Sequence, residues 1–174
     1  MPKYDLDRSK AIVCSCAPAV RTDFLTLAKK ENLPEENLKA PDFVYIPLRK
    51  PVVNGDAFAR VVSPCATANS MDFAFVLDDG RTLLGEMKFN VDKSIRGQLN
   101  TILCKYKGSY RHLYALVHCQ FYNQSFVLFN ESAYEEGKSV LNRLDESFQD
   151  DRLVSELKLH FVANTLPFFS QKFF

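Results

Sequence analysis

The sequence lacks the features of membrane, secreted and disulfide-bonded proteins. No segment reaches the roughly 18 consecutive apolar residues that a membrane-spanning helix needs. The first ten residues, MPKYDLDRSK, carry charges where a signal peptide would have an apolar core. The five cysteines are odd in number and irregularly spaced, which favours reduced, structural thiols over a disulfide framework. We therefore expect an intracellular protein without membrane contact, in the cytoplasm, or in the nucleus if the source is eukaryotic or viral.

Signatures of several enzyme classes are also missing. Cys14-x-Cys16 does not have the two-residue spacing usual in zinc sites, and no pair of histidines lies near it. His118 and Cys119 are adjacent, and neighbours on a strand point to opposite faces. The sequence has no P-loop, no GxSxG and no dinucleotide fingerprint. These patterns give no support to zinc, thiol, serine or nucleotide-cofactor chemistry.

The length and charge fit a single globular domain with an uneven charge distribution. The chain has 174 residues, enough to bury a substantial core, and a net charge of +1. Residues 88–111 contain six basic side chains and one acid, whereas residues 131–158 contain eight acids and four bases. A phosphate-binding face can be present within a nearly neutral total. A solvated, basic helix face explains the same pattern equally well.

The order of predicted elements is that of an α/β protein. Apolar periodicity predicts helices over residues 17–31, 94–107, 132–148 and 152–162, and strands over residues 43–46, 57–62, 72–77, 82–89, 113–118 and 125–129. Asp92 is expected to cap the second helix, and Gly108 to follow its last turn. Strands 72–77 and 82–89 are apolar on both faces, which is typical of a sheet covered on both sides.

These elements predict one domain with a three-layer α/β/α core, a mixed central sheet and extra C-terminal helices. The core is expected to span residues 17–130 and the helical extension residues 131–174. The last nine residues are unusually aromatic. They either dock into the core or form a dimer contact, and we favour docking.

The turn between the two central strands predicts their register. Asp78-Asp79-Gly80 is a three-residue hairpin loop, with Gly80 in the left-handed position. In that register, opposite residues have numbers that sum to 158, so Asp72 faces Glu86. Lys88 then lies one step further along the same face. A two-residue loop would instead place Asp72 on the other face.

Two carboxylates on opposite strands suggest a cation site. Like charges directly opposite on a sheet repel each other, and a divalent cation would reverse that effect. Oxygen ligands without histidine or cysteine favour Mg²⁺ or Mn²⁺, which also take water and phosphate as ligands. Lys88 would position a water or offset charge on a phosphate. The alternative is a surface salt bridge between Glu86 and Lys88, with Asp72 only starting its strand.

The segment SMDFAFVLDDGRTLLGEMKFN resembles the motif of the PD-(D/E)XK nuclease superfamily. Asp72-x13-Glu86-x-Lys88 matches an apolar strand with the metal aspartate, a polar turn, and a second strand ending in Glu-x-Lys. The resemblance implies a restriction-endonuclease-like fold that cuts phosphodiester bonds with one or two divalent metals. It implies that Asp72 and Glu86 bind metal, that the main-chain carbonyl of Met87 is a further ligand, and that Lys88 is the catalytic lysine.

The resemblance also suggests supporting residues. Gln98 is the candidate for a polar residue on the helix after the motif. A glutamate from the first helix would be Glu31, Glu35 or Glu36, and the sequence does not choose between them. The Pro41-Asp42 pair has the letters of the motif but lies 44 residues before Glu86, so Asp72 is preferred.

The sequence therefore predicts a Mg²⁺- or Mn²⁺-dependent nuclease, expected to be an endonuclease that acts on DNA rather than RNA. Its nucleic-acid contacts are expected at four basic residues: Lys93, Arg96, Lys105 and Lys107. A homodimer or a larger nuclease assembly fits the small size of the chain. The alternatives are a nucleic-acid- or protein-binding module on the same fold without turnover, and an unrelated α/β interaction protein.

Overall fold

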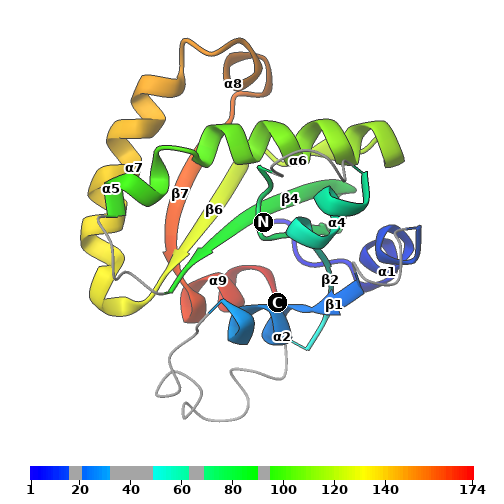
Figure 1. Ribbon diagram of the computed structural model, residues 1–174. Helices are drawn as coiled ribbons and strands as arrows, with labels where there is room; N and C mark the ends of the chain where they lie inside the picture. The colour runs from blue at the N-terminus through cyan, green and yellow to red at the C-terminus, as the bar shows by residue number, and fades with distance from the viewer. Residues whose placement is uncertain (16–20, 32–48, 63–68, 90–94) are drawn as a thin grey trace.

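The computed structural model describes residues 1–15, 21–31, 49–62, 69–89 and 95–174, and these form an α/β protein with a mixed, open seven-strand sheet (Figure 1). The strand order is β1-β2-β3-β4-β6-β7, and β5 also pairs with β4. Strands β1 to β4 pair with one another in antiparallel fashion, whereas β5 and β6 run parallel to β4, and β7 runs parallel to β6. The strands are β1 (Arg21–Asp23), β2 (Pro51–Asn54), β3 (Phe73–Val76), β4 (Arg81–Lys88), β5 (Gln120–Phe121), β6 (Gln124–Phe129) and β7 (His160–Thr165). The prediction of an α/β protein with a mixed sheet is confirmed.

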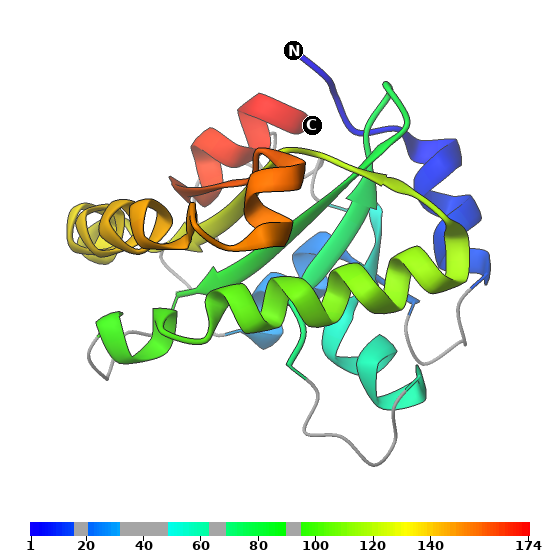
Figure 2. The ribbon, with the colours of Figure 1, turned by 90° about the horizontal axis from the view of Figure 1, so that it is seen from above.

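Helices cover both faces of this sheet. One face carries α2 (Phe24–Lys30) and α9 (Leu166–Phe173), which lie side by side. The other face packs against α4 (Gly55–Val62), α5 (Ile95–Leu99), α6 (Ile102–Val117), α7 (Tyr134–Phe148) and α8 (Arg152–Leu157). The long helix α6 crosses the strands on that face (Figures 1 and 2), and α1 (Leu6–Ser15) packs along β2 and β3.

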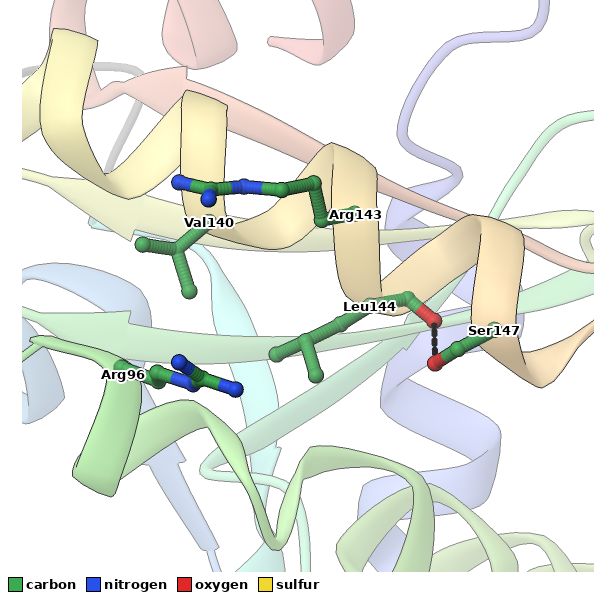
Figure 3. A pocket seen from close by; sticks show the side chains of 5 residues that line it. All are labelled: Arg96, Val140, Arg143, Leu144 and Ser147. Carbon is green, nitrogen blue, oxygen red and sulfur yellow. Dashed lines mark hydrogen bonds between the residues drawn. The ribbon is translucent and has the colours of Figure 1, made fainter.

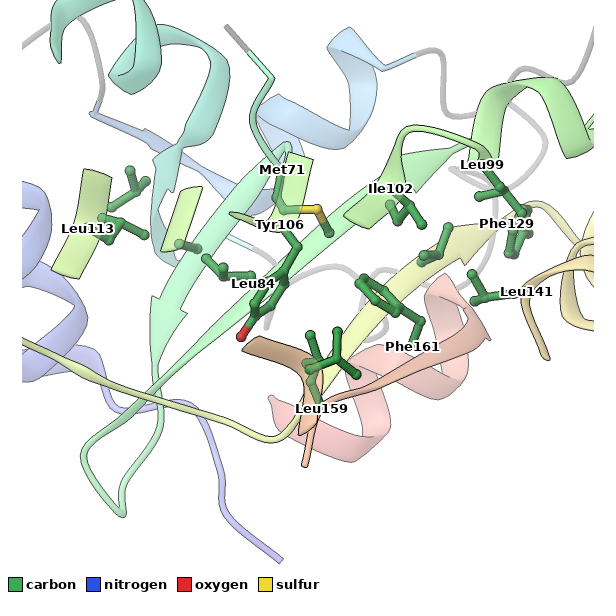
Figure 4. Close-up of a cluster of buried hydrophobic side chains, with 14 of the residues drawn as sticks. Met71, Leu84, Leu99, Ile102, Tyr106, Leu113, Phe129, Leu141, Leu159 and Phe161 are labelled. Carbon is green, nitrogen blue, oxygen red and sulfur yellow. The ribbon is translucent and has the colours of Figure 1, made fainter. Parts of the chain in front are cut away.

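Two apolar clusters follow from the alternation of side chains along β3 and β4. Phe73 and Phe75 point towards α2 and α9, while Ala74 and Leu84 point towards α6. The cluster beneath α6 brings Tyr106 against Phe161 of β7, with ring centroids 5.9 Å apart (Figure 4). The sheet is therefore buried on both sides, as its apolar strands predict.

The hairpin has the register that the turn predicts. Phe73 pairs with Gly85 and Val76 pairs with Thr82, so the residue numbers of opposite pairs sum to 158. Gly80 has a φ of 84°, and its N–H donates to the carbonyl of Leu77 at 2.8 Å. One residue before Phe73, the same register sets Asp72 beside Glu86.

The strand predicted over residues 57–62 is wrong, because this segment belongs to helix α4. The side chain of Asn54 accepts from the N–H of Ala57 at 3.0 Å, which satisfies a donor at the start of the helix. Phe58 and Ala59 are buried, while Val61 and Val62 remain exposed. The cap from Asn54 and the burial of one side of the segment explain why it forms a helix.

The prediction for residues 94–118 is partly wrong. The helical segment is broken after Leu99 and resumes as α6, which runs on through the strand predicted over residues 113–118. Gly108 therefore does not end a helix. A Cβ on Gly108 would lie 2.0 Å from the carbonyl oxygen of Asn69, so glycine is needed for close approach of α6 to the chain before β3.

Other boundaries also move. The first predicted helix begins only at Phe24, where Asp23 caps α2 by accepting from the N–H of Thr26 at 2.9 Å, and β1 precedes it. The helix predicted over residues 152–162 ends at Leu157, since Lys158 adopts a left-handed φ of 49° before β7 begins. Part of the predicted C-terminal extension therefore belongs to the sheet. Helix α7 and strand β6 confirm the predictions for residues 132–148 and 125–129, and the strand predicted over residues 43–46 lies outside the described residues.

The aromatic C-terminus docks into the core, as favoured from the sequence. Phe169 and Phe173 of α9 are fully buried, and their ring centroids lie 5.4 and 5.1 Å from that of Phe126. Among the described cysteines, Cys14, Cys104 and Cys119 are free thiols. No helix within the described ranges is long and apolar enough to cross a membrane.

Candidate metal centre

Asp72 and Glu86 meet on the face of the sheet that α6 covers. Asp72 stands just before β3 and Glu86 lies in β4, and both alternate with Ala74 and Leu84, which point towards α6. Asp72 is 5% exposed and Glu86 is 0% exposed. Burying two carboxylates is costly unless each finds a cation or hydrogen-bond donors. The contacts of these two groups therefore define the chemistry of the site.

Glu86 is held by two lysines through only one of its oxygens. The Nζ atoms of Lys88 and Lys105 both lie 2.5 Å from its Oε1. Its Oε2 is buried and has no hydrogen-bond partner among the described residues. An unsatisfied buried acceptor costs about 1–3 kcal/mol, more when charged, so a donor or a cation at Oε2 would stabilise this group.

Asp72 contacts the main chain of β4 and Lys105 of α6. Its Oδ2 accepts from the N–H of Met87 at 2.6 Å, and its Oδ1 lies 3.9 Å from the Nζ of Lys105. Met87 thus contributes its amide to the centre, while the metal role of its carbonyl stays a prediction. Lys105 therefore contacts both carboxylates.

Lys105 was expected to contact a nucleic-acid backbone rather than to join the carboxylates. Its place in α6 explains the difference, because it lies between Ile102 and Ser109 on the buried stripe of the helix. Ser109 fixes this stripe, since its Oγ accepts from the N–H of Met71 at 2.8 Å. The sequence signal that could have identified Lys105 is its spacing, because it lies three positions after Ile102 on the apolar face of the predicted helix.

The electrostatics of the pair are those of crowded, buried acids. Burial, followed by the negative charge of Glu86, raises the pKa of Asp72 well above its ordinary value, although Lys105 and Lys88 partly oppose this. Burial alone would lower the pKa of Lys105, but the charges of Glu86 and Asp72 outweigh it and raise that pKa. Burial and the neighbouring carboxylate thus oppose the ionisation of Asp72, while the two carboxylates stabilise the charged ammonium of Lys105.

Two further acids lie within electrostatic reach. Burial, then the negative charges of Asp56 and Glu86, raises the pKa of Glu31 at the end of α2. Asp56, at the start of α4, accepts from the Oγ of Ser70 at 2.6 Å and also raises the pKa of Lys105. Of the three first-helix candidates, Glu31 is thus near the centre, while Glu35 and Glu36 lie outside the described residues.

The other predicted site residues do not gather at the carboxylates as one surface. Arg96 is exposed and lines a pocket of about 270 Å³ between α5 and α7, together with Arg143 and Leu144 (Figure 3). Lys107 lies two positions after Lys105 in α6, so its side chain points to nearly the opposite side of the helix. There it pairs with Asp151. Lys93 lies outside the described residues, and Gln98 is half-buried on α5, so their roles stay predictions.

The donor set fits a hard divalent cation at the Asp72–Glu86 pair. Mg²⁺ commonly takes one or two protein carboxylates and completes its shell with water and phosphate. Within the described ranges, no group of three or more His, Cys, Asp or Glu side chains is arranged to hold a metal ion. The pair would therefore hold the ion without Glu31 or Asp56 as direct ligands in this arrangement.

Comparison of the chain with protein-family models, with curated proteins and with solved structures finds no match. The arrangement of the residues themselves is therefore the basis for assigning a function.

Proposed function

We propose that this protein is a metal-dependent nuclease of PD-(D/E)XK type that hydrolyses phosphodiester bonds in nucleic acid, with DNA favoured over RNA. The observation that supports this best is the buried Asp72–Glu86 pair, in which Glu86 keeps an unpartnered oxygen while two lysines reach the other. A pair of buried acids is costly as a purely structural feature. It is useful where a divalent cation and a phosphate must be held together.

Each residue of the centre has a distinct role in this proposal. Asp72 and Glu86 would hold Mg²⁺ or Mn²⁺, which when bound supplies an activated water and offsets charge on the phosphate. The N–H of Met87 keeps the carboxylate of Asp72 oriented. Lys88, at the end of β4 and 16% exposed at its side chain, would stabilise the negative charge that grows on the phosphate oxygens.

A binding module without turnover is the second candidate. It is favoured by the charge balance of the centre, since two ammonium groups already face two carboxylates. On this view the cluster is an ion-pair network that fixes α6 on the sheet, and nucleic acid or protein binds elsewhere. Such a module would bind its partner equally well in the presence of a chelator.

Cleavage assays separate the two candidates. Supercoiled plasmid, duplex DNA, single-stranded DNA and single-stranded RNA would be incubated with the protein in Mg²⁺, in Mn²⁺ or in chelator. We expect cleavage only with the divalent ions, and losses of about 100-fold or more in Asp72→Asn and Glu86→Gln, the scale for removing one key electrostatic group.

Matched controls come from acids at exposed positions. Asp79→Asn changes the tip of the same hairpin, where Asp79 pairs with Arg81, and Glu156→Gln changes an exposed acid on α8. Both should keep wild-type cleavage. Cleavage that survives both Asp72→Asn and Glu86→Gln would eliminate the proposed centre, and binding without cleavage in any metal would favour the module.

A further inference from the structure

Lys105 occupies a different position in the centre from Lys88. Its Nζ lies 2.5 Å from Glu86 Oε1 and 3.9 Å from Asp72 Oδ1, so a single cation contacts both carboxylates. Lys88 reaches Glu86, and the described residues show no ion pair between Lys88 and Asp72. Contact with both carboxylates is what a divalent ion bound by the pair would also require.

The charges of the centre make joint occupancy unfavourable. The two carboxylates face two ammonium groups, and a divalent ion added without another change would leave the cluster with an excess of positive charge. Like charges a few ångströms apart at this buried pair repel strongly. Either the metal stays out, or one ammonium group moves.

We propose that Lys105 is a resident counter-ion, which holds the metal-free Asp72–Glu86 pair and is displaced when a divalent cation binds. This inference rests on the proposed metal centre. The side chain moves rather than the helix, because Ser109 and Gly108 fix α6 against residues 69–71. Lys105 has a flexible four-carbon stem and is 23% exposed at its side chain, so it has a path to solvent.

The displaced ammonium remains at the edge of the centre. It is then free to pair with an anionic group, such as a phosphate oxygen of a bound nucleic acid. Metal binding would in this way both complete the centre and present a positive charge to the substrate. Lys105 would be a positioning residue in the metal-free protein and a phosphate contact in the metal-bound protein.

Calorimetric titration of the full chain with Mn²⁺, without nucleic acid, tests this exchange. Lys105→Met keeps the length and apolar character of the stem but removes the competing charge. We expect it to bind Mn²⁺ about tenfold more tightly or better, the scale expected from removing a like charge about 4 Å away. Lys107→Met is the matched control, since it removes a charge on the same helix that pairs with Asp151 instead.

A second readout is the melting temperature with and without Mn²⁺. In chelator, Lys105→Met should have a lower melting temperature than wild type. Mn²⁺ should raise the melting temperature of Lys105→Met more than that of wild type, and that of Lys107→Met by the same amount as wild type. Equal or weaker Mn²⁺ binding by Lys105→Met would overturn the exchange, and the metal centre would still stand if Asp72→Asn and Glu86→Gln abolish binding. Absence of Mn²⁺ binding in wild type and in Lys105→Met would overturn both.

Discussion

Gly85 controls whether the two carboxylates can stand side by side. It lies opposite Phe73, and a Cβ at position 85 would fall 2.1 Å from Cζ of that ring and under 3 Å from both Cε atoms. The ring is fully buried and has little room to shift. Its centroid lies 4.8 Å from that of Phe24 and 5.7 Å from that of Phe169. Gly85→Ala must therefore move the hairpin or the ring.

The cost of Gly85→Ala follows from this packing. Adding one carbon to a well-packed core typically costs about 1–3 kcal/mol, and a contact enclosed by aromatic rings belongs near the top of that range. We expect a loss of about 3 kcal/mol in the free energy of unfolding, measured by urea denaturation. Because Glu86 is the next residue, Mn²⁺ binding should weaken together with stability.

Two comparison variants make this test specific. Gly97→Ala lies in α5, where an added Cβ meets nothing within 4 Å, and it should stabilise the protein by up to about 1 kcal/mol. Phe73→Leu combined with Gly85→Ala should recover part of the loss, because the neighbours share one space. A Gly85→Ala protein as stable as wild type would refute the claim that this contact sets the hairpin.

Three more predictions concern Asp72, the aromatic C-terminus and the anchoring of α6. In chelator, wild type should lose stability as pH rises from about 3.8 towards the raised pKa of Asp72, because the folded state holds that proton more tightly. Melting curves of Asp72→Asn should lack this loss, and a difference from wild type that is constant with pH would contradict it. Phe169→Ala should cost about 3–5 kcal/mol in denaturant unfolding, whereas Phe168→Ala, 68% exposed, should cost little. Ser109→Ala strands the buried N–H of Met71 and should cost about 1–3 kcal/mol, and an unchanged midpoint would show that this bond does not anchor α6.

The hairpin could be predicted because its determinants are local. The three-residue turn that ends at Gly80 fixes the register, and the register sets Asp72 beside Glu86. Gly85 opposite Phe73 agrees with the same register. Information within about 20 residues was therefore enough to bring the two carboxylates together.

The parts that failed depend on contacts between distant segments. A glycine at this point in a helical pattern is typical of a helix end. Gly108 instead lies inside α6, where it allows the close approach of Asn69. Strand β7 gains its pairing from β6, which the apolar pattern of residues 160–165 does not reveal. The contacts of Lys105 with the two carboxylates were not predicted for the same reason, since its partners lie 19 and 33 residues away in sequence and become visible only once α6 is placed on the sheet.

A crystal structure determined from crystals grown with Mn²⁺ tests the central claim most directly. The proposed centre predicts an anomalous difference peak bound by carboxylate oxygens of both Asp72 and Glu86, at coordination distances of about 2.0–2.3 Å. It also predicts that the Nζ of Lys105 no longer contacts both carboxylates. If crystals grown at a saturating Mn²⁺ concentration show no anomalous peak at the pair and Lys105 still contacts both carboxylates, the proposed metal centre is contradicted.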